Sequence, residues 1–163
     1  MMDKKVLVEQ LAERLRTAAR TARRASQEAA QEAREGATPA ERREDARVAL
    51  EQGGLARGQE RRAEQAAVSL AAIERFQPPS FAPNARIDLG AIVEIEDEEG
   101  GRTLFLAPVG AGEELTGPDG DGFLSVVTPS SPVGRALMGR REGETVEVTI
   151  GGDVRELSIT FVG

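Results

Sequence analysis

The sequence contains no cysteine, histidine, tryptophan or tyrosine. Without cysteine and histidine, the chain has no disulfide framework, no thiol or imidazole nucleophile and no Cys/His zinc site. No apolar run approaches the ~20 residues of a membrane-spanning helix, and residues 1–10 lack the apolar core of a secretory signal. These absences predict a cytoplasmic protein without a membrane span.

Charge is abundant and unevenly placed. Charged residues make up 30% of the 163 residues and apolar residues 39%, which is typical of a chain with a long solvated helix pair. Residues 1–79 carry 15 Lys/Arg and 13 Asp/Glu (+2), whereas residues 80–163 carry 6 Arg and 15 Asp/Glu (−9), which together give −7. The asymmetry allows an N-terminal arm near nucleic acid and an acidic body away from it, and a simple solvated helix pair explains the first half equally well.

The first part of the chain has the period of a coiled-coil helix. Apolar and small residues alternate at spacings of four and three, which predicts a helix over about residues 6–35 with a heptad seam. At ~1.5 Å rise per residue this helix would be roughly 45 Å long. The seam consists of Leu11, Leu15, Ala18, Ala22, Ala25 and Ala29.

A second helix is predicted over about residues 39–76, running antiparallel to the first. Three glycines, Gly53, Gly54 and Gly58, lie inside it, and each costs up to ~1 kcal/mol relative to alanine. Close helix–helix packing or a small kink is the favoured explanation, and a flexible joint is the alternative. The matching seam consists of Ala49, Gln52, Ala56, Gln59, Ala63, Ala66, Leu70 and Ile73.

A turn signal separates the two predicted helices near residues 36–41. Gly36 ends the first helix, Thr38 is a good N-cap, Pro39 fits the first helical position, and Glu41 completes a capping box. The second helix therefore restarts here. The hairpin tip carries carboxylates that a long arm would hold far from the body, namely Glu35, Glu41, Glu44 and Asp45.

After Gln77-Pro78-Pro79-Ser80 the pattern changes to short β-favouring runs, which predicts a small α+β body. A short helix at residues 131–139, capped by Ser131 and closed by Gly139, precedes the fourth strand. The Gly-rich acidic segment 110–122 is expected to be a mobile loop. The predicted strands are residues 91–95, 103–106, 123–127, 145–150 and 155–162. The predicted domains are a coiled-coil hairpin at 1–76, a linker at 77–84 and the body at 85–163.

Residues 124–148 of this body read LSVVTPSSPVGRALMGRREGETVEV. The stretch resembles a pattern of the Gre-type (GreA/GreB family) transcript-cleavage factors of bacterial RNA polymerase. In that pattern a strand ends in Ser-Pro, a helix carries Ala-Leu-hydrophobic-Gly, and basic residues precede Gly-acid-x-Val-x-Val. The order of hairpin, proline linker and β body is similar to the family over nearly the whole chain, strongly over residues 87–162 and weakly over residues 1–76.

The resemblance implies a fold, a partner and a shared metal. Family proteins have an FKBP-like C-terminal fold, dock it at the rim of the polymerase secondary channel, and pass the hairpin down the channel toward the catalytic Mg²⁺. Bacterial RNA polymerase is therefore the expected partner of a monomeric chain, with nascent RNA within reach. The chain needs no cofactor of its own. Glu41, Glu44 and Asp45 would help to bind a Mg²⁺ shared with the polymerase, because carboxylates are hard oxygen ligands and a second metal activates water for phosphodiester cleavage.

The tip departs from the family pattern. Cleavage-competent members have an Asp just after the tip glycine and a Glu-Asn pair three residues on, whereas residues 36–43 here read GATPAERR. The Asp is absent, and Arg42 and Arg43 would compete with Mg²⁺ for the carboxylates by forming ion pairs. The capping box alone accounts for Glu41, and attraction to the helix dipole accounts for Glu44 and Asp45.

Three functions therefore stay open. The chain stimulates RNA cleavage by the polymerase, or occupies the channel and inhibits or alters initiation without cleavage, or is a coiled-coil interaction module unrelated to polymerase. Polymerase binding is favoured over cleavage. In the body, the candidate polymerase contacts are Arg135, Arg140 and Arg141, which flank the short helix, although a solvated arginine on a small domain explains each of them equally well.

Overall fold

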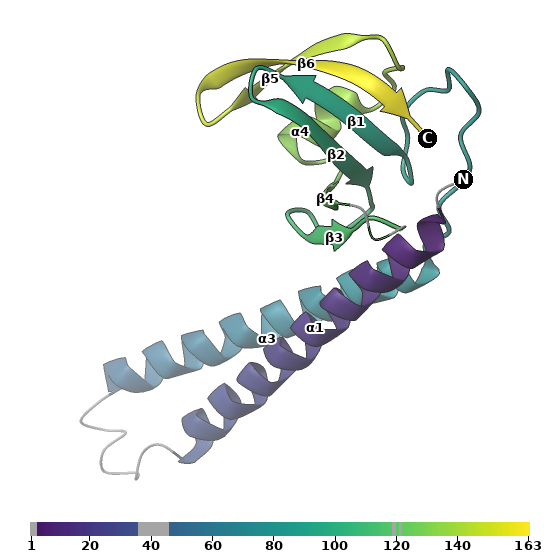
Figure 1. Ribbon diagram of the computed structural model, residues 1–163. Helices are drawn as coiled ribbons and strands as arrows, with labels where there is room; N and C mark the ends of the chain where they lie inside the picture. The colour runs from purple at the N-terminus through teal and green to yellow at the C-terminus, as the bar shows by residue number, and fades with distance from the viewer. Residues whose placement is uncertain (1–2, 36–45, 119, 121) are drawn as a thin grey trace. The chain divides into compact units, whose positions relative to one another are not determined.

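The computed structural model describes residues 3–35, 46–118, 120 and 122–163 (Figure 1). The chain divides into two compact units. One comprises residues 1–12 together with residues 72–163, and the other comprises residues 13–71. The division falls inside both long helices, so the first turns of one and the last turn of the other belong with the body. The linker expected at residues 77–84 stays a prediction.

Two long helices, α1 (Lys4–Glu35) and α3 (Ala46–Arg75), form the helical part, and between residues 13 and 71 they run antiparallel (Figure 1). The predicted helical hairpin is confirmed. Of the predicted seam, Leu15 and Ala22 are half-buried, but Ala18 is exposed and Ala19 is half-buried in its place. A straight α-helix has 3.6 residues per turn, whereas a strict heptad pattern assumes 3.5. The predicted seam positions therefore shift around the helix surface with each heptad, and the pattern selects Ala18 where Ala19 is the half-buried residue. The capping box at Thr38–Glu41 lies outside the described residues.

The helical unit has little core of its own. Among residues 13–35, 47 and 50–71, whose burial is described, none is buried. The buried residues of the two helices, Leu7, Leu11, Ala12 and Ile73, all lie in the other unit. Alanine-rich seams remove little apolar area from water, and most helical stability in proteins comes from packing of an apolar face. The pair is therefore expected to gain stability from any surface that covers it.

The three glycines of α3 do not mark a close approach between helices. A methyl group at Gly58 would meet nothing within 4 Å, and at Gly53 it would meet only a side-chain nitrogen of Arg57, in the same helix, at 3.4 Å. The close helix–helix packing favoured from the sequence is therefore wrong at these positions. Their helical backbone is compatible with alanine.

Replacing Gly58 by alanine should stabilise the helical unit by about 1 kcal/mol, because alanine loses less backbone entropy on forming a helix and nothing obstructs its methyl group. Urea unfolding followed by circular dichroism at 222 nm measures the change. A loss of stability would show that some other surface occupies the space beside Gly58.

The body is built on a six-stranded sheet in the order β3-β4-β2-β1-β6-β5 (Figure 1). Neighbouring strands are antiparallel except β2 and β4, which are parallel, so the sheet is mixed. The fold is therefore α+β, as predicted. The strands are β1 (Ile92–Asp97), β2 (Gly100–Leu106), β3 (Glu114–Thr116), β4 (Phe123–Val127), β5 (Thr145–Ile150) and β6 (Asp153–Val162), with helix α4 (Pro132–Leu137) between β4 and β5.

Five of these six strands match strands predicted from the sequence. In β5, for example, Val146 and Val148 are buried and the residues between them are exposed. The exception is β3, which pairs with β4 inside the segment expected to be a loop. That expectation is wrong for Glu114–Thr116, because a three-residue edge strand with one buried leucine, Leu115, leaves almost no alternation to detect.

The main core lies between the sheet and α4. Leu137 is fully buried against inward-facing residues of the central strands, such as Val93 and Leu157, and Val133 and Met138 pack at its margin. The short helix predicted at residues 131–139 thus covers the sheet with these three side chains. No helix among the described ranges is long and apolar enough to cross a membrane.

The first turns of α1 are part of this body. The Gln10 side chain donates to the carbonyl of Thr116 (2.9 Å) and accepts from the Thr116 N–H (3.0 Å), so its amide takes the place of a neighbouring strand at the β3 edge. One residue further on, Leu11 packs on Gly110, where a Cβ would lie 2.7 Å from the leucine Cδ1. Gly110 also has a φ of 91°, a conformation that favours glycine. These contacts join α1 to the sheet edge.

Candidate functional site

The predicted tip carboxylates, Glu41, Glu44 and Asp45, lie outside the described residues. Within the described ranges, no group of three or more His, Cys, Asp or Glu side chains is placed to hold a metal ion. The part of the candidate site that the structure does describe is therefore the surface around α4.

Helix α4 is fixed at its start by its own cap. The Ser131 hydroxyl accepts from the N–H of Gly134 (3.2 Å) and donates to the carbonyl of Thr128 (2.7 Å). Pro132 occupies the first helical position, where its missing N–H costs nothing. The carbonyl of Thr128 lies so close to Gly134 that a Cβ there would be 1.9 Å from it. The Thr-Pro-Ser-Ser-Pro-Val-Gly sequence thus sets the direction in which α4 leaves β4.

The chain beyond α4 pairs with the segment that leads into the sheet. The N–H of Ile87 donates to the carbonyl of Arg140 (2.7 Å), and the N–H of Gly139 donates to the carbonyl of Ile87 (2.8 Å). The side chain of Arg86 also donates to the carbonyl of Gly139 (3.1 Å). These bonds bring Arg86 beside Arg140, although the two residues are far apart in sequence.

Four exposed arginines therefore gather around α4 and the chain that follows it. Arg135 is held by a hydrogen bond to the carbonyl of Ser130 (3.1 Å), and the N–H of Arg141 donates to the Glu144 carboxylate. We call Arg86, Arg135, Arg140 and Arg141 the arginine surface.

The arginine surface differs from the other two arginines of the body in its partners. Arg102 pairs with Asp97 (3.2 Å) and Arg155 pairs with Glu99 (3.3 Å), both at the β1–β2 hairpin. By contrast, no arginine of the arginine surface forms an ion pair with any described residue. In a body with a net charge of −9, these unneutralised cations form a local positive region suited to an acidic partner.

The sequence pointed to three of these residues, and all three are exposed on α4 or shortly after it. Arg86 was missed because nothing local distinguishes it, and only the pairing of Ile87 with residues 139–140 reveals its place. In the turn between β1 and β2, Glu98 and Glu99 are exposed. Asp97 is different, because its side chain is only 7% exposed and is paired with Arg102.

Comparison with known proteins identifies the class of this chain. The family model for the C-terminal part of the transcription elongation factors GreA and GreB matches residues 82–163, about half of the chain and the whole of the sheet and arginine surface. The chain therefore belongs to the GreA/GreB family of transcription elongation factors.

Individual relatives agree with this assignment. Transcription elongation factor GreA from Polaromonas naphthalenivorans is 33% identical over 93 residues, which are 57% of this chain and 55% of the relative. GreA from Methylococcus capsulatus is 32% identical over 116 residues, 71% of this chain and 67% of the relative. The chain thus spans about half the length of the first of these relatives and two thirds of the second.

Two solved structures can be aligned with this chain at low TM-scores. The crystal structure of GreA factor homolog 1 (Gfh1) of Thermus thermophilus is 21% identical, with a TM-score of 0.40, and the match covers 93% of this chain and 94% of that one. GreA/GreB from Nitrosomonas europaea is 22% identical, with a TM-score of 0.36, over 60% of this chain and 78% of the other.

Proposed function

We propose that this chain binds bacterial RNA polymerase at its secondary channel and modulates transcription elongation from the cytoplasm as a monomer. The observation that carries the proposal is that the family match covers the same body that bears the arginine surface. Four exposed arginines that form no ion pair with any acidic side chain in the described ranges supply long-range attraction and hydrogen-bond donors for carboxylates of a protein partner. The arginine surface is the proposed docking face of the body.

The helical hairpin is the proposed channel element. Its described residues between 13 and 71 include none that is buried, so the pair is slender and weakly packed. A channel wall that covered the exposed faces of α1 and α3 would add the burial that the pair lacks. The same property suits a second candidate, a coiled-coil module that pairs with another helix bundle.

Binding to core polymerase decides between these candidates. We expect the full chain to co-migrate with core polymerase in gel filtration at low salt and to sediment alone as a monomer. Self-association through residues 1–76, without any affinity for polymerase, would overturn the proposal and favour the coiled-coil module. The sedimentation measurement serves as the control for the binding measurement, since it uses the same protein without its partner.

Two mechanisms remain within the proposed function, and they differ at the tip. In the first, Glu41, Glu44 and Asp45 supply oxygen ligands for a Mg²⁺ in the polymerase site, and the polymerase cleaves backtracked RNA. In the second, the tip occupies the channel and impedes nucleotide entry. Two features of the sequence favour the second mechanism. The family Asp is replaced, and Arg42 and Arg43 lie beside Glu41.

The triple substitution Glu41→Ala, Glu44→Ala and Asp45→Ala separates these mechanisms. If the tip only occupies the channel, the variant should keep at least about half of the inhibition of RNA extension, because the volume of the arm is unchanged. If the carboxylates hold Mg²⁺, cleavage should fall by about 100-fold or more, the scale of losing a charged group from an active site. The assay uses stalled complexes with end-labelled RNA.

The control for this assay replaces Glu28, Glu32 and Glu51 by alanine, which removes the same charge from the helices outside the tip. An equal effect of the two triple variants would show that total charge matters and that the tip has no special role.

A further inference from the structure

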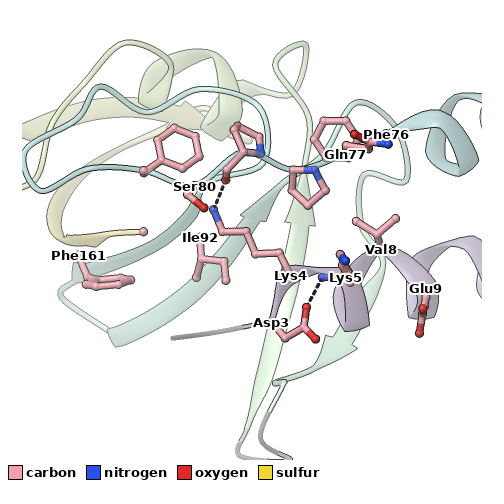
Figure 2. Close-up of a pocket in the computed structure, with 14 residues that line it drawn as sticks. Asp3, Lys4, Lys5, Val8, Glu9, Phe76, Gln77, Ser80, Ile92 and Phe161 are labelled. Atoms are coloured by element: carbon pink, nitrogen blue, oxygen red, sulfur yellow. Dashed lines mark hydrogen bonds between the residues drawn. The ribbon is translucent and has the colours of Figure 1, made fainter.

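A cavity of about 720 Å³ lies at the start of α1, in the unit that contains the sheet (Figure 2). Its walls come from three places in the sequence, namely the first turns of α1, residues 76–81 after α3, and the strands β1 and β6. Most of the wall is apolar or aromatic. The apolar side chains are Val8, Phe76, Pro78, Pro79, Phe81, Ile92 and Phe161.

One wall of the cavity is rigid. Gly90 has a φ of 92°, and a Cβ there would lie 2.6 Å from a ring carbon of Pro79 and 3.1 Å from the Cα of Pro78. The two prolines therefore lie directly on the backbone that leads into β1. Ile92 forms another part of the wall. Its backbone N–H donates to the carbonyl of Gly163 (2.7 Å), and its carbonyl accepts from the Gly163 N–H (2.9 Å). A preformed wall lowers the entropy that a ligand loses on binding.

Lys4 brings a cation to this apolar wall. Figure 2 shows its side chain extending from α1 toward residues 79–81. The ammonium donates to the carbonyl of Pro79 (2.8 Å) and lies 4.5 Å from the centre of the Phe81 ring. It forms no ion pair with any residue in the described part of the chain. A neutral carbonyl and a ring face leave the charge only partly compensated, so donor capacity remains for an anion.

The other charged residues that line the cavity are more exposed than Lys4. Asp3, Lys5 and Glu9 are all exposed, and the carboxylate of Asp3 already accepts from the backbone N–H of Lys5 (3.0 Å). Burial lowers the pKa of Lys4 from 10.5 to about 8, because desolvation disfavours the ammonium. The side chain is still mainly protonated at neutral pH. Lys4 is therefore the cation that a ligand inside the cavity would meet.

We propose that this cavity binds a small organic monoanion, with an aromatic or branched apolar body against the Phe and Pro side chains and one carboxylate on the Lys4 ammonium. The size is that of sites for small molecules, which are commonly ~300–1,000 Å³, mostly apolar and oriented by a few polar groups. A charged hydrogen bond in partly buried surroundings fixes the orientation of such a ligand. This inference does not rest on the proposed polymerase function.

The probe for this site is 2-naphthoate, with 2-naphthalenemethanol as its neutral counterpart. Because the chain has no tryptophan or tyrosine, naphthalene fluorescence anisotropy can be followed on the full chain without protein emission. We expect saturable binding of one naphthoate, and binding of the alcohol weaker by about tenfold, the scale of one hydrogen bond to a charged group. This comparison uses the unmodified protein and does not depend on the folding of any variant.

The variant Lys4→Met should weaken naphthoate binding by about tenfold and leave binding of the alcohol within about twofold. Arg23→Met is the control, since it removes one positive charge from an exposed position of the same helix that does not line the cavity, and it should change neither. Equal binding of naphthoate and the alcohol, equal losses in the two variants, or no saturation by millimolar probe would overturn the proposal. All measurements are made without polymerase, so they succeed or fail independently of polymerase binding.

Discussion

Gly134→Ala should destabilise the body by about 3 kcal/mol or more, at the upper end of the effects of overpacking. The added methyl carbon would lie 1.9 Å from the carbonyl oxygen of Thr128 and 2.9 Å from the Ser131 hydroxyl. That carbonyl cannot simply move away, because it already accepts from the hydroxyl and the N–H of Ser131. The strain can be relieved only by displacing α4 or by breaking its cap.

Urea unfolding of the body measures this loss, and Gly58→Ala is the matched control. The same substitution is made in a helix in both cases, but the methyl group is obstructed only at Gly134. We expect opposite signs in the two variants. A loss below about 1 kcal/mol at Gly134 would mean that the segment between β4 and α4 yields easily, and the rigid cap described above would then be wrong.

The structural disturbance caused by Gly134→Ala should extend to the arginine surface. Leu137 is fully buried under α4, and the chain after it pairs with Ile87. A shift of α4 therefore disturbs the bonds that hold Arg86 and Arg140 together. Any polymerase affinity lost by Gly134→Ala thus reports on folding, and variants that keep the helix in place are needed to test the arginines themselves.

Local signals explain what the sequence predicted correctly. The alternation of Val146 and Val148 predicts β5 with its observed limits, and the Ser-Pro start of α4 predicts its cap. Both long helices follow from apolar spacing, and α1 also lacks glycine and proline. Each of these signals lies within a few residues, so chain order alone is enough to find it.

The remaining features depend on contacts between distant segments. Gln10 pairs with β3, Leu11 packs on Gly110, and Arg86 lies beside Gly139. No single stretch of sequence records these pairings. The glycines of α3 show the opposite error, in which a local signal suggested close packing although no neighbouring helix meets them.

The candidate site also combines features that local sequence signals predict with features that only the structure shows. Arg135, Arg140 and Arg141 stand next to the motif that carries the family resemblance, and were found from it. Their isolation from acidic partners, in contrast to Arg102 and Arg155, could come only from the structure. The sequence does not show that difference, because Arg140 and Arg141 lie within three residues of an acidic residue, as Arg102 and Arg155 also do.

Neutralising part of the arginine surface should weaken polymerase binding strongly at low salt. For Arg86→Gln combined with Arg140→Gln we expect about tenfold to 100-fold lower affinity, since two cations facing an acidic surface each contribute about 0.7–1.4 kcal/mol. Glutamine at position 86 keeps a side-chain N–H donor near the carbonyl of Gly139. The local backbone conformation should therefore be unchanged. Surface plasmon resonance with immobilised core polymerase gives the affinity and both rate constants.

The matched control is Arg102→Gln combined with Arg155→Gln, which removes the same charge from the same body at its two ion-paired arginines. Its polymerase affinity should stay within about threefold, because total charge acts only weakly beyond a Debye length of ~8–10 Å. The loss in the first variant should appear partly in the association rate and should shrink as salt is raised, since exposed charges are screened. Equal losses in both double variants would show that the body is attracted by net charge alone. An unchanged affinity in the first variant, in a chain that still binds polymerase, would place the docking face elsewhere on the body and leave the proposed function standing.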